Sequence, residues 1–172
     1  AVITGAGGLL GPHHAIALSY AGAKVYLLDI DDHGLNNCKK KLLKENPNAS
    51  VEIFNADITD LESIESLSNS LTNEGTFIDI LINNAALNPT MKEIEEGVTG
   101  RVEDYDLNEW NKELNVGITG AFICSRVFGS KMAEKEKGVI INISSDLAIR
   151  APDQRVYSPT ESFDDIKSYK PL

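Results

Sequence analysis

Short apolar runs alternate with amphipathic segments of helical spacing five times along this 172-residue chain. The runs have the length and composition of strands, and helices account for the segments between them. Strands apolar enough to be buried on both faces, joined by helices, predict a parallel sheet covered on both sides. The predicted fold class is therefore a doubly wound α/β sheet. The expected strands are 1–4, 24–29, 51–55, 78–82 and 139–143.

Composition excludes several classes of partner. Twenty-six acidic residues against sixteen basic ones give a net charge of -10, which argues against nucleic acid and anionic lipid. No apolar run approaches the roughly 20 residues that span a membrane. The two cysteines, Cys38 and Cys124, fall far apart in predicted helices. They form neither a disulfide framework nor a metal site, so we expect a cytoplasmic protein without a metal.

A glycine-rich turn follows the first predicted strand and precedes the first helix. It runs from Gly5 to Gly11, and Pro12 then suits the first turn of a helix. Small residues let the backbone approach a pyrophosphate, and free N–H groups at the helix start face the anion. Many loops between strand and helix carry glycine, so an ordinary turn remains the alternative. The turn alone predicts a phosphate site only weakly.

Asp29 supports the phosphate interpretation. It ends the second predicted strand, 18 residues after Gly11. A carboxylate there accepts hydrogen bonds from the ribose hydroxyls of an adenosine and repels a 2′-phosphate, which favours NAD over NADP. No arginine or lysine lies in the turn or directly after Asp29. Turn and acid together predict a Rossmann-type NAD site, and a solvated acid at a strand end is the alternative.

From Val2 to about Ile149 the sequence resembles the short-chain dehydrogenases/reductases. Thr4–Gly11 is similar to the family's Thr-Gly-x-x-x-Gly-x-Gly turn, with Leu9 in place of the middle glycine and a glycine displaced to Gly8. Three further motifs match in order. They are Asp57 facing the adenine, Asn83-Asn84-Ala85-Ala86 beneath the nicotinamide ribose, and the catalytic pair Asn115 and Ser145.

The resemblance implies roles for individual residues. Ser145 would polarise the substrate oxygen, and Asn115 would position a water in a proton relay. The loop 87–105 would line the substrate pocket, because it follows a strand at its carboxyl end. The implied cofactor contacts come from Gly5, Gly8, Leu9, Leu10, Gly11, Asp29, Ile30, Asp57, Ile58, Asn84, Ala85 and Ala86.

The family's catalytic tyrosine, with a lysine four residues later, has no clear match. Tyr157 is followed by Glu161, and Pro159 would interrupt the helix between them. We therefore expect 1–172 to be a single NAD-binding domain truncated at its C-terminal end, and 150–172 to be an inserted loop before a missing Tyr-x-x-x-Lys. Such an insertion resembles the branch associated with bacterial surface-sugar and flagellin modification. A catalytically inactive member with Tyr157 at the site is the alternative.

The implied function is an NAD-dependent oxidoreductase that transfers hydride between the nicotinamide and an alcohol or carbonyl substrate, with a sugar derivative as one option. The family also implies a homodimer or homotetramer. Two alternatives remain open from the sequence: a non-catalytic NAD-binding regulator, and a sugar-nucleotide epimerase or dehydratase.

Overall fold

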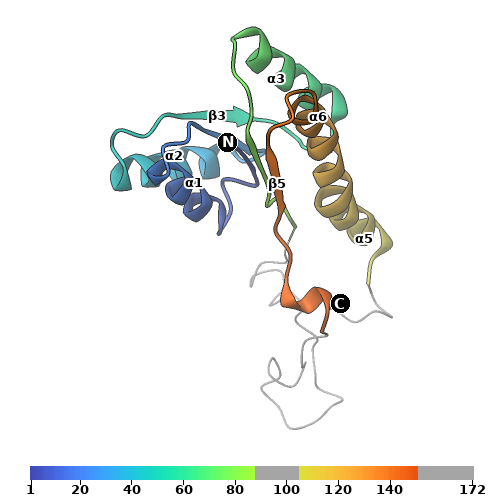
Figure 1. Cartoon of the computed structure of the whole chain (residues 1–172). Helices are drawn as coiled ribbons and strands as arrows, with labels where there is room; N and C mark the ends of the chain where they lie inside the picture. Colours follow the sequence, from blue (N-terminus) through green and yellow to red (C-terminus); the bar gives the residue numbers. More distant parts are fainter. Residues whose placement is uncertain (88–104, 151–172) are drawn as a thin grey trace. The chain divides into compact units, whose positions relative to one another are not determined.

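The computed structural model describes residues 1–87 and 105–150, and it divides the chain into two compact units. The first unit comprises Ala1–Ala86 and Asn115–Ile143, and it holds the sheet (Figure 1). The second comprises Leu87–Leu114 and Ser144–Leu172. Each unit is described by itself below.

The sheet of the first unit contains five parallel strands in the order β3-β2-β1-β4-β5. The chain builds outward from β1 to β3, then returns to the other side of β1 for β4 and β5. This order confirms the predicted Rossmann-type α/β fold, with its switch point between β1 and β4. The strands are β1 (Val2–Thr4), β2 (Val25–Asp29), β3 (Val51–Asn55), β4 (Ile80–Asn83) and β5 (Val139–Asn142).

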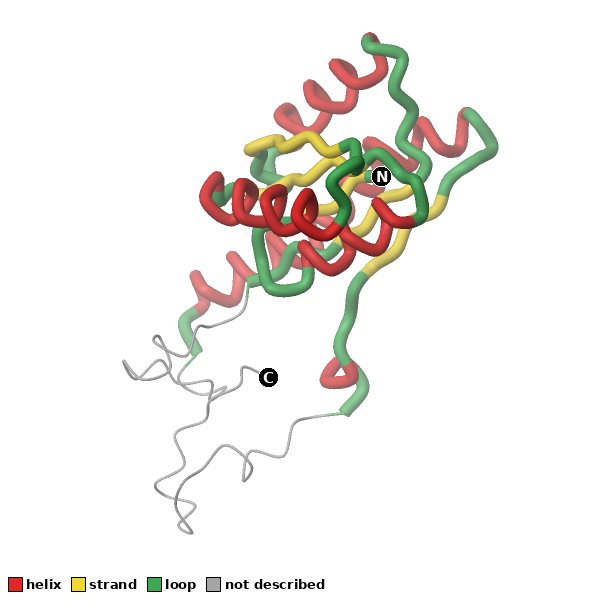
Figure 2. Tube along the Cα trace, turned by 90° about the vertical axis from the view of Figure 1, so that its left-hand side faces the viewer, coloured by secondary structure: helices red, strands yellow, loops and turns green. Residues whose placement is uncertain are grey.

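Helices cover both faces of this sheet (Figure 2). Adjacent strand residues point to opposite faces, so Ile3 joins one hydrophobic cluster and Val2 the other. The helices are α1 (Gly11–Tyr20) and α2 (Asp32–Glu45) on the face of the Ile3 cluster, and α3 (Leu61–Asn73) and α6 (Ala121–Glu134) on the face of the Val2 cluster. The Ile3 cluster contains side chains of α1 and α2, and the Val2 cluster contains side chains of α3 and α6.

Aspartate caps explain where two of these helices begin. Asp60 precedes α3 and accepts a hydrogen bond from the backbone N–H of Glu62 at 3.1 Å. Asp31 does the same for α2, accepting from the N–H of His33 at 2.9 Å. In both cases the carboxylate satisfies an N–H group that has no partner inside the helix.

β5 is exposed although its apolar sequence is typical of a buried strand. All four of its residues are exposed, among them Val139 at 47% and Ile140 at 37%. β5 is the edge strand, and among the described elements only β4 and α6 pack against it. Apolar sequence made this strand, but neighbours on only one side and one face leave it uncovered.

The helical segment that precedes β5 is divided into three parts. It starts after Asp106, whose carboxylate accepts from the N–H groups of Asn108 at 2.6 Å and Glu109 at 3.2 Å. Its first part is α5 (Leu107–Leu114) in the second unit, and its next part is a π-helix, η1 (Asn115–Gly120), that leads into α6 in the first unit. Such π segments are rare and occur frequently at functional sites.

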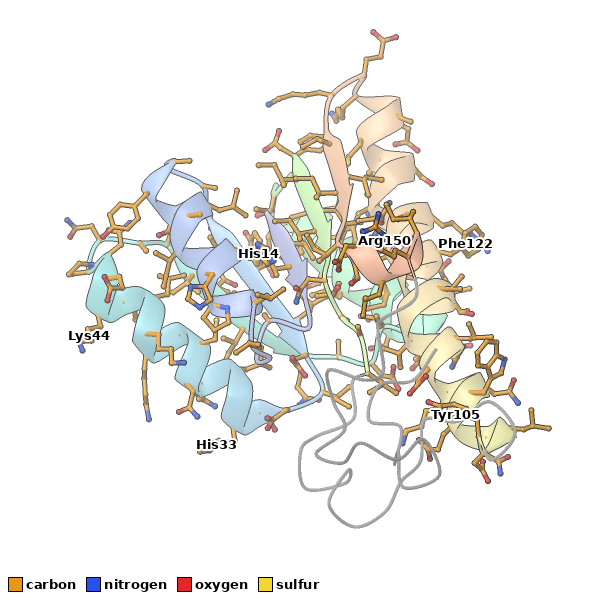
Figure 3. The ribbon with its side chains drawn as sticks, turned by 90° about the horizontal axis from the view of Figure 1, so that it is seen from below. His14, His33, Lys44, Tyr105, Phe122 and Arg150 are labelled. Carbon is orange, nitrogen blue, oxygen red and sulfur yellow. The ribbon has the colours of Figure 1, made fainter. Side chains whose placement is uncertain are left out.

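The second unit has a small polar–aromatic cluster. Tyr105 is labelled in Figure 3. Its hydroxyl donates to Oε1 of Glu113 at 2.6 Å, and its ring meets Trp110 edge-on, with the ring centroids 6.5 Å apart. Burial and the neighbouring Glu113 carboxylate raise the pKa of Tyr105 well above its usual range. Within residues 1–87 and 105–150, no helix has the length and apolar character needed to cross a membrane.

Candidate functional site

Three neighbouring strands deliver the candidate cofactor residues to one edge of the sheet. β1 ends at Thr4, β2 at Asp29 and β4 at Asn83, and β1 lies between the other two. Parallel strands place their carboxyl ends at the same edge, so the glycine turn after β1 emerges between Asp29 and Asn84. This is the switch point at which doubly wound sheets bind ligands.

The glycine turn needs glycine at Gly5. This residue has φ +62°, and a Cβ atom on it would lie 2.6 Å from Cα of Ala85. Leu9, which departs from the family motif, is not among the described residues with positive φ, and its side chain is 86% exposed. The backbone at position 9 therefore needs no glycine, and the leucine is accommodated by pointing into solvent.

Free backbone donors lie at the end of this turn. The N–H groups of Leu9, Leu10 and Gly11 donate to no other described residue, and Leu10, the N-cap of α1, makes no side-chain capping bond. The N–H of Gly8 is already used by the carbonyl of Gly5, at 3.2 Å. Unsatisfied donors at a helix N-terminus fit an anionic group, and a pyrophosphate would satisfy them.

The Asp29 carboxylate is held in a fixed orientation beside the turn. Its Oδ2 accepts from the N–H of Gly7 at 2.9 Å, and its Oδ1 accepts from the N–H of Asp31 at 3.0 Å. A carboxylate oxygen has two lone pairs, so each oxygen retains one for a ribose hydroxyl. Ile30, the next predicted contact, has an exposed side chain at the same edge.

Asp57 and Ile58 follow β3 and differ in their surroundings. Oδ1 of Asp57 accepts from the N–H and the hydroxyl of Thr59, at 2.8 and 2.7 Å, which leaves Oδ2 without a partner among the described residues. Ile58 is 6% exposed and belongs to the core cluster. Any contact of Ile58 with a cofactor would therefore come from its backbone.

The Asn-Asn-Ala-Ala segment is tied to the glycine turn by hydrogen bonds. Nδ2 of Asn84 donates to the carbonyl oxygens of Thr4 and Gly5, both at 3.0 Å. The hydroxyl of Thr4 accepts from the N–H groups of Asn84 and Ala85, at 3.0 and 3.1 Å. Asn84 thus fixes the loop that carries Ala85 and the exposed Ala86. Thr4 was predicted only as the first residue of the glycine-turn motif, and these bonds give it a role of its own.

Asn83 was predicted only as a member of the motif beneath the nicotinamide ribose, and the structure shows a further role in packing. Its side chain is buried, and Nδ2 donates to Oγ of Ser125 at 2.9 Å and to Oδ1 of Asn142 at 2.8 Å. These bonds join the ends of β4 and β5 to α6. The sequence signals for this network were the motif itself and a polar residue at the end of a buried strand.

The two predicted catalytic residues belong to different units. Asn115 is the first residue of η1 in the first unit, exposed, and without a hydrogen bond from its amide to another described residue. Ser145 belongs to the second unit. Its Oγ accepts from the N–H of Leu147 at 3.2 Å and donates to Asp146 at 3.1 Å, so it caps a short 3-10 helix.

Other predictions fall outside the described residues. Tyr157, the proposed inserted loop except for Arg150, and most of the predicted substrate loop 87–105 lie in this part of the chain. The described residues contain no cluster of histidine, cysteine or acidic side chains that could hold a metal ion.

Comparison with known sequences decides the family. The family model for short chain dehydrogenase matches residues 1–161. The chain belongs to the short-chain dehydrogenase family. An uncharacterized oxidoreductase of Thermotoga maritima is 31% identical over 163 residues, covering 94% of this chain and 59% of that protein. Galactitol 2-dehydrogenase of Rhizobium johnstonii is 29% identical over 145 residues, covering 84% and 52%.

Solved structures agree with this assignment. Levodione reductase superposes with a TM-score of 0.77 at 29% identity, covering 88% of this chain and 55% of that one. Among other structures of the same fold, one is bound to NAD+ and another is in complex with NADP. The chain spans 52 to 59% of the length of the two relatives compared above.

Proposed function

We propose that the chain binds NAD(H) and forms the cofactor-binding part of an oxidoreductase acting on an alcohol or carbonyl substrate. The observation that carries the cofactor proposal is the Asp29 carboxylate, held by Gly7 and Asp31 at the end of β2. A carboxylate in this position pairs with ribose hydroxyls and repels a 2′-phosphate. The first lysine or arginine after Asp29 is Lys39, so the intervening segment offers that phosphate no lysine or arginine.

The bound dinucleotide would supply hydride acceptance or donation at its nicotinamide. The free N–H groups of Leu9, Leu10 and Gly11 would bind the pyrophosphate. The hydroxyl of Ser145 would donate to the substrate oxygen, and Asn115 would hold a water that passes the proton. The role of Ser145 requires its bond to Asp146 to be exchanged for a bond to the substrate, whereas the amide of Asn115 has no partner among the described residues to give up.

A sugar-derived alcohol is the substrate class we favour, and the likeness to galactitol 2-dehydrogenase supports it. A homodimer or homotetramer belongs to the same proposal. So does a reducing cytoplasmic location, which suits the two buried free thiols Cys38 and Cys124.

Fluorescence titration with NADH and NADPH tests the cofactor proposal. The unsubstituted chain should bind NADH more tightly. Asp29→Asn removes the charge in an isosteric side chain, and the NADH preference should fall by about tenfold or more, since hydrogen bonds to charged groups contribute about 1.5–3 kcal/mol. Asp32→Asn removes the same charge three residues later, at an exposed position, and should keep the preference.

Two results would contradict the proposal: tighter binding of NADPH by the unsubstituted chain, or an unchanged preference in Asp29→Asn. Turnover is tested separately in the complete protein by following NADH absorbance with galactitol or xylitol as substrate. NADH binding without turnover on any alcohol would favour a regulator, and bound NAD without net redox change would favour an epimerase.

A further inference from the structure

The N-terminal turn of α2 contains a glycine at a position where helices disfavour it. Gly34 is the third residue of α2 and is buried. Glycine inside a helix is less favourable than alanine, because it loses more backbone freedom on folding. Gly34 has no positive φ that would require glycine. Its conformation therefore does not explain its presence, and the space around it does.

Gly34 lies in direct backbone contact with Gly7 of the glycine turn. A Cβ atom on Gly34 would lie 2.9 Å from the carbonyl oxygen of Gly7 and 2.8 Å from Oδ2 of Asp31. Conversely, a Cβ atom on Gly7 would lie 2.9 Å from Cα of Gly34. Most of these neighbours are backbone atoms, which cannot rotate away as the end of a side chain can. A side chain at either position would have to move the helix end or the turn.

The contact between Gly7 and Gly34 lies next to the groups that hold the Asp29 carboxylate. The N–H of Gly7 and the N–H of Asp31 hold its two oxygens. Asp31 in turn caps α2 through the N–H of His33. Gly34 follows His33 in α2 and contacts the backbone of Gly7. The distance between the glycine turn and the carboxylate is thus set by how closely α2 approaches the turn.

We propose that Gly34 is a positioning residue of the cofactor site, which aligns Asp29 by letting α2 lie against Gly7. This rests on the proposed NAD function. A methyl group at position 34 would separate the helix from the turn and loosen the bond from Gly7 to Asp29. The carboxylate would then recognise the ribose hydroxyls less well, and it would also repel a 2′-phosphate less strongly. The substitution should therefore weaken the binding of NADH more than the binding of NADPH.

Gly34→Ala tests this inference, with His33→Ala as its control. His33 is exposed in the same turn, on α2 (Figure 3), and its capping contact comes from the backbone, which alanine retains. Dissociation constants for NADH and NADPH are measured by fluorescence titration on each folded variant. In Gly34→Ala, we expect the NADH constant to rise tenfold or more and the NADPH constant to rise less. The ratio of the NADPH to the NADH dissociation constant should therefore fall. His33→Ala should leave both dissociation constants unchanged.

The titrations distinguish a failure of the Gly34 role from a failure of NAD binding. If Gly34→Ala keeps both constants, or weakens both cofactors by the same factor, Gly34 has only a packing role and the inference is wrong. If the unsubstituted chain binds neither cofactor, the proposed function and the inference fall together. Gly7→Ala adds a methyl group from the other side of the same contact. It should narrow the preference in the same way, and it provides the test if Gly34→Ala does not fold.

Discussion

Gly120 makes the close contact between η1 and the loop after β3, and it offers a sharp test of how this fold is packed. A Cβ atom on Gly120 would lie 2.5 Å from Cδ1 of Ile58 and 2.6 Å from its Cγ1. Carbon atoms in contact normally lie about 3.5–4.0 Å apart. Ile58 is buried, so its side chain cannot swing into solvent. Gly120→Ala should therefore force the helix and the loop apart.

The expected loss can be worked out from two opposing effects. Inserting a methyl group into a packed core costs about 1–3 kcal/mol. The better helix propensity of alanine offsets about 0.5–1 kcal/mol of that. The free energy of unfolding should fall by about 1–2 kcal/mol. For a chain of this size, that loss lowers the melting temperature by about 3–6 °C.

Urea unfolding followed by circular dichroism measures this loss, and a double-mutant cycle identifies its cause. Ile58→Ala removes Cγ1 and Cδ1 and should itself cost about 2–5 kcal/mol. The remaining Cβ lies 3.4 Å from the new methyl group, a tight but tolerable distance. The loss of stability in the double variant should therefore be about 1–2 kcal/mol smaller than the sum of the losses in the two single variants.

Gly117→Ala is the matched control in the same π-helix. A Cβ atom there meets nothing within 4 Å, so this variant should be as stable as the parent or slightly more stable. The packing argument would be refuted by a Gly120→Ala variant as stable as the parent. Strict additivity in the cycle would refute it as well, because the two side chains would then not share the contact.

Two further predictions concern buried groups. Burial raises the pKa of Cys38 to about 11 and that of Cys124 to about 12, so neither thiol should react with iodoacetamide at neutral pH until urea unfolds the chain. Above the ordinary thiol pKa of 9.0, an unfolded chain loses these protons while the folded chain keeps them. The free energy of unfolding should therefore fall as the pH rises above 9.0. Rapid labelling of the folded chain at neutral pH would contradict the raised pKa values on which both predictions rest. Thr4→Val leaves two backbone N–H groups without their acceptor and should cost about 1–3 kcal/mol in urea unfolding. Thr4→Ser keeps the hydroxyl and should lose only about 0.8 kcal/mol for the methyl group, so equal losses in the two variants would show that the hydroxyl contributes nothing.

Local sequence patterns were sufficient to predict most elements. The strand predicted over 24–29 depends on neighbours only a few residues away, and it occurs as β2 (Val25–Asp29). β4 begins at Ile80, although the apolar run begins at Ile78. Ile78 is buried in the core without pairing in the sheet, and hydrophobicity alone does not distinguish these two fates.

The sequence by itself therefore determined the alternation of strands and helices, the fold class, and the positions of the glycine turn and Asp29. Only the tertiary structure decided which groups meet there. The bond from Gly7 to Asp29 spans 22 residues, and the backbone contact between Gly7 and Gly34 spans a similar stretch. The exposure of β5 also depends on which strands flank it. Hydrophobic periodicity reports each segment's own burial, whereas such contacts depend on how distant segments pack together.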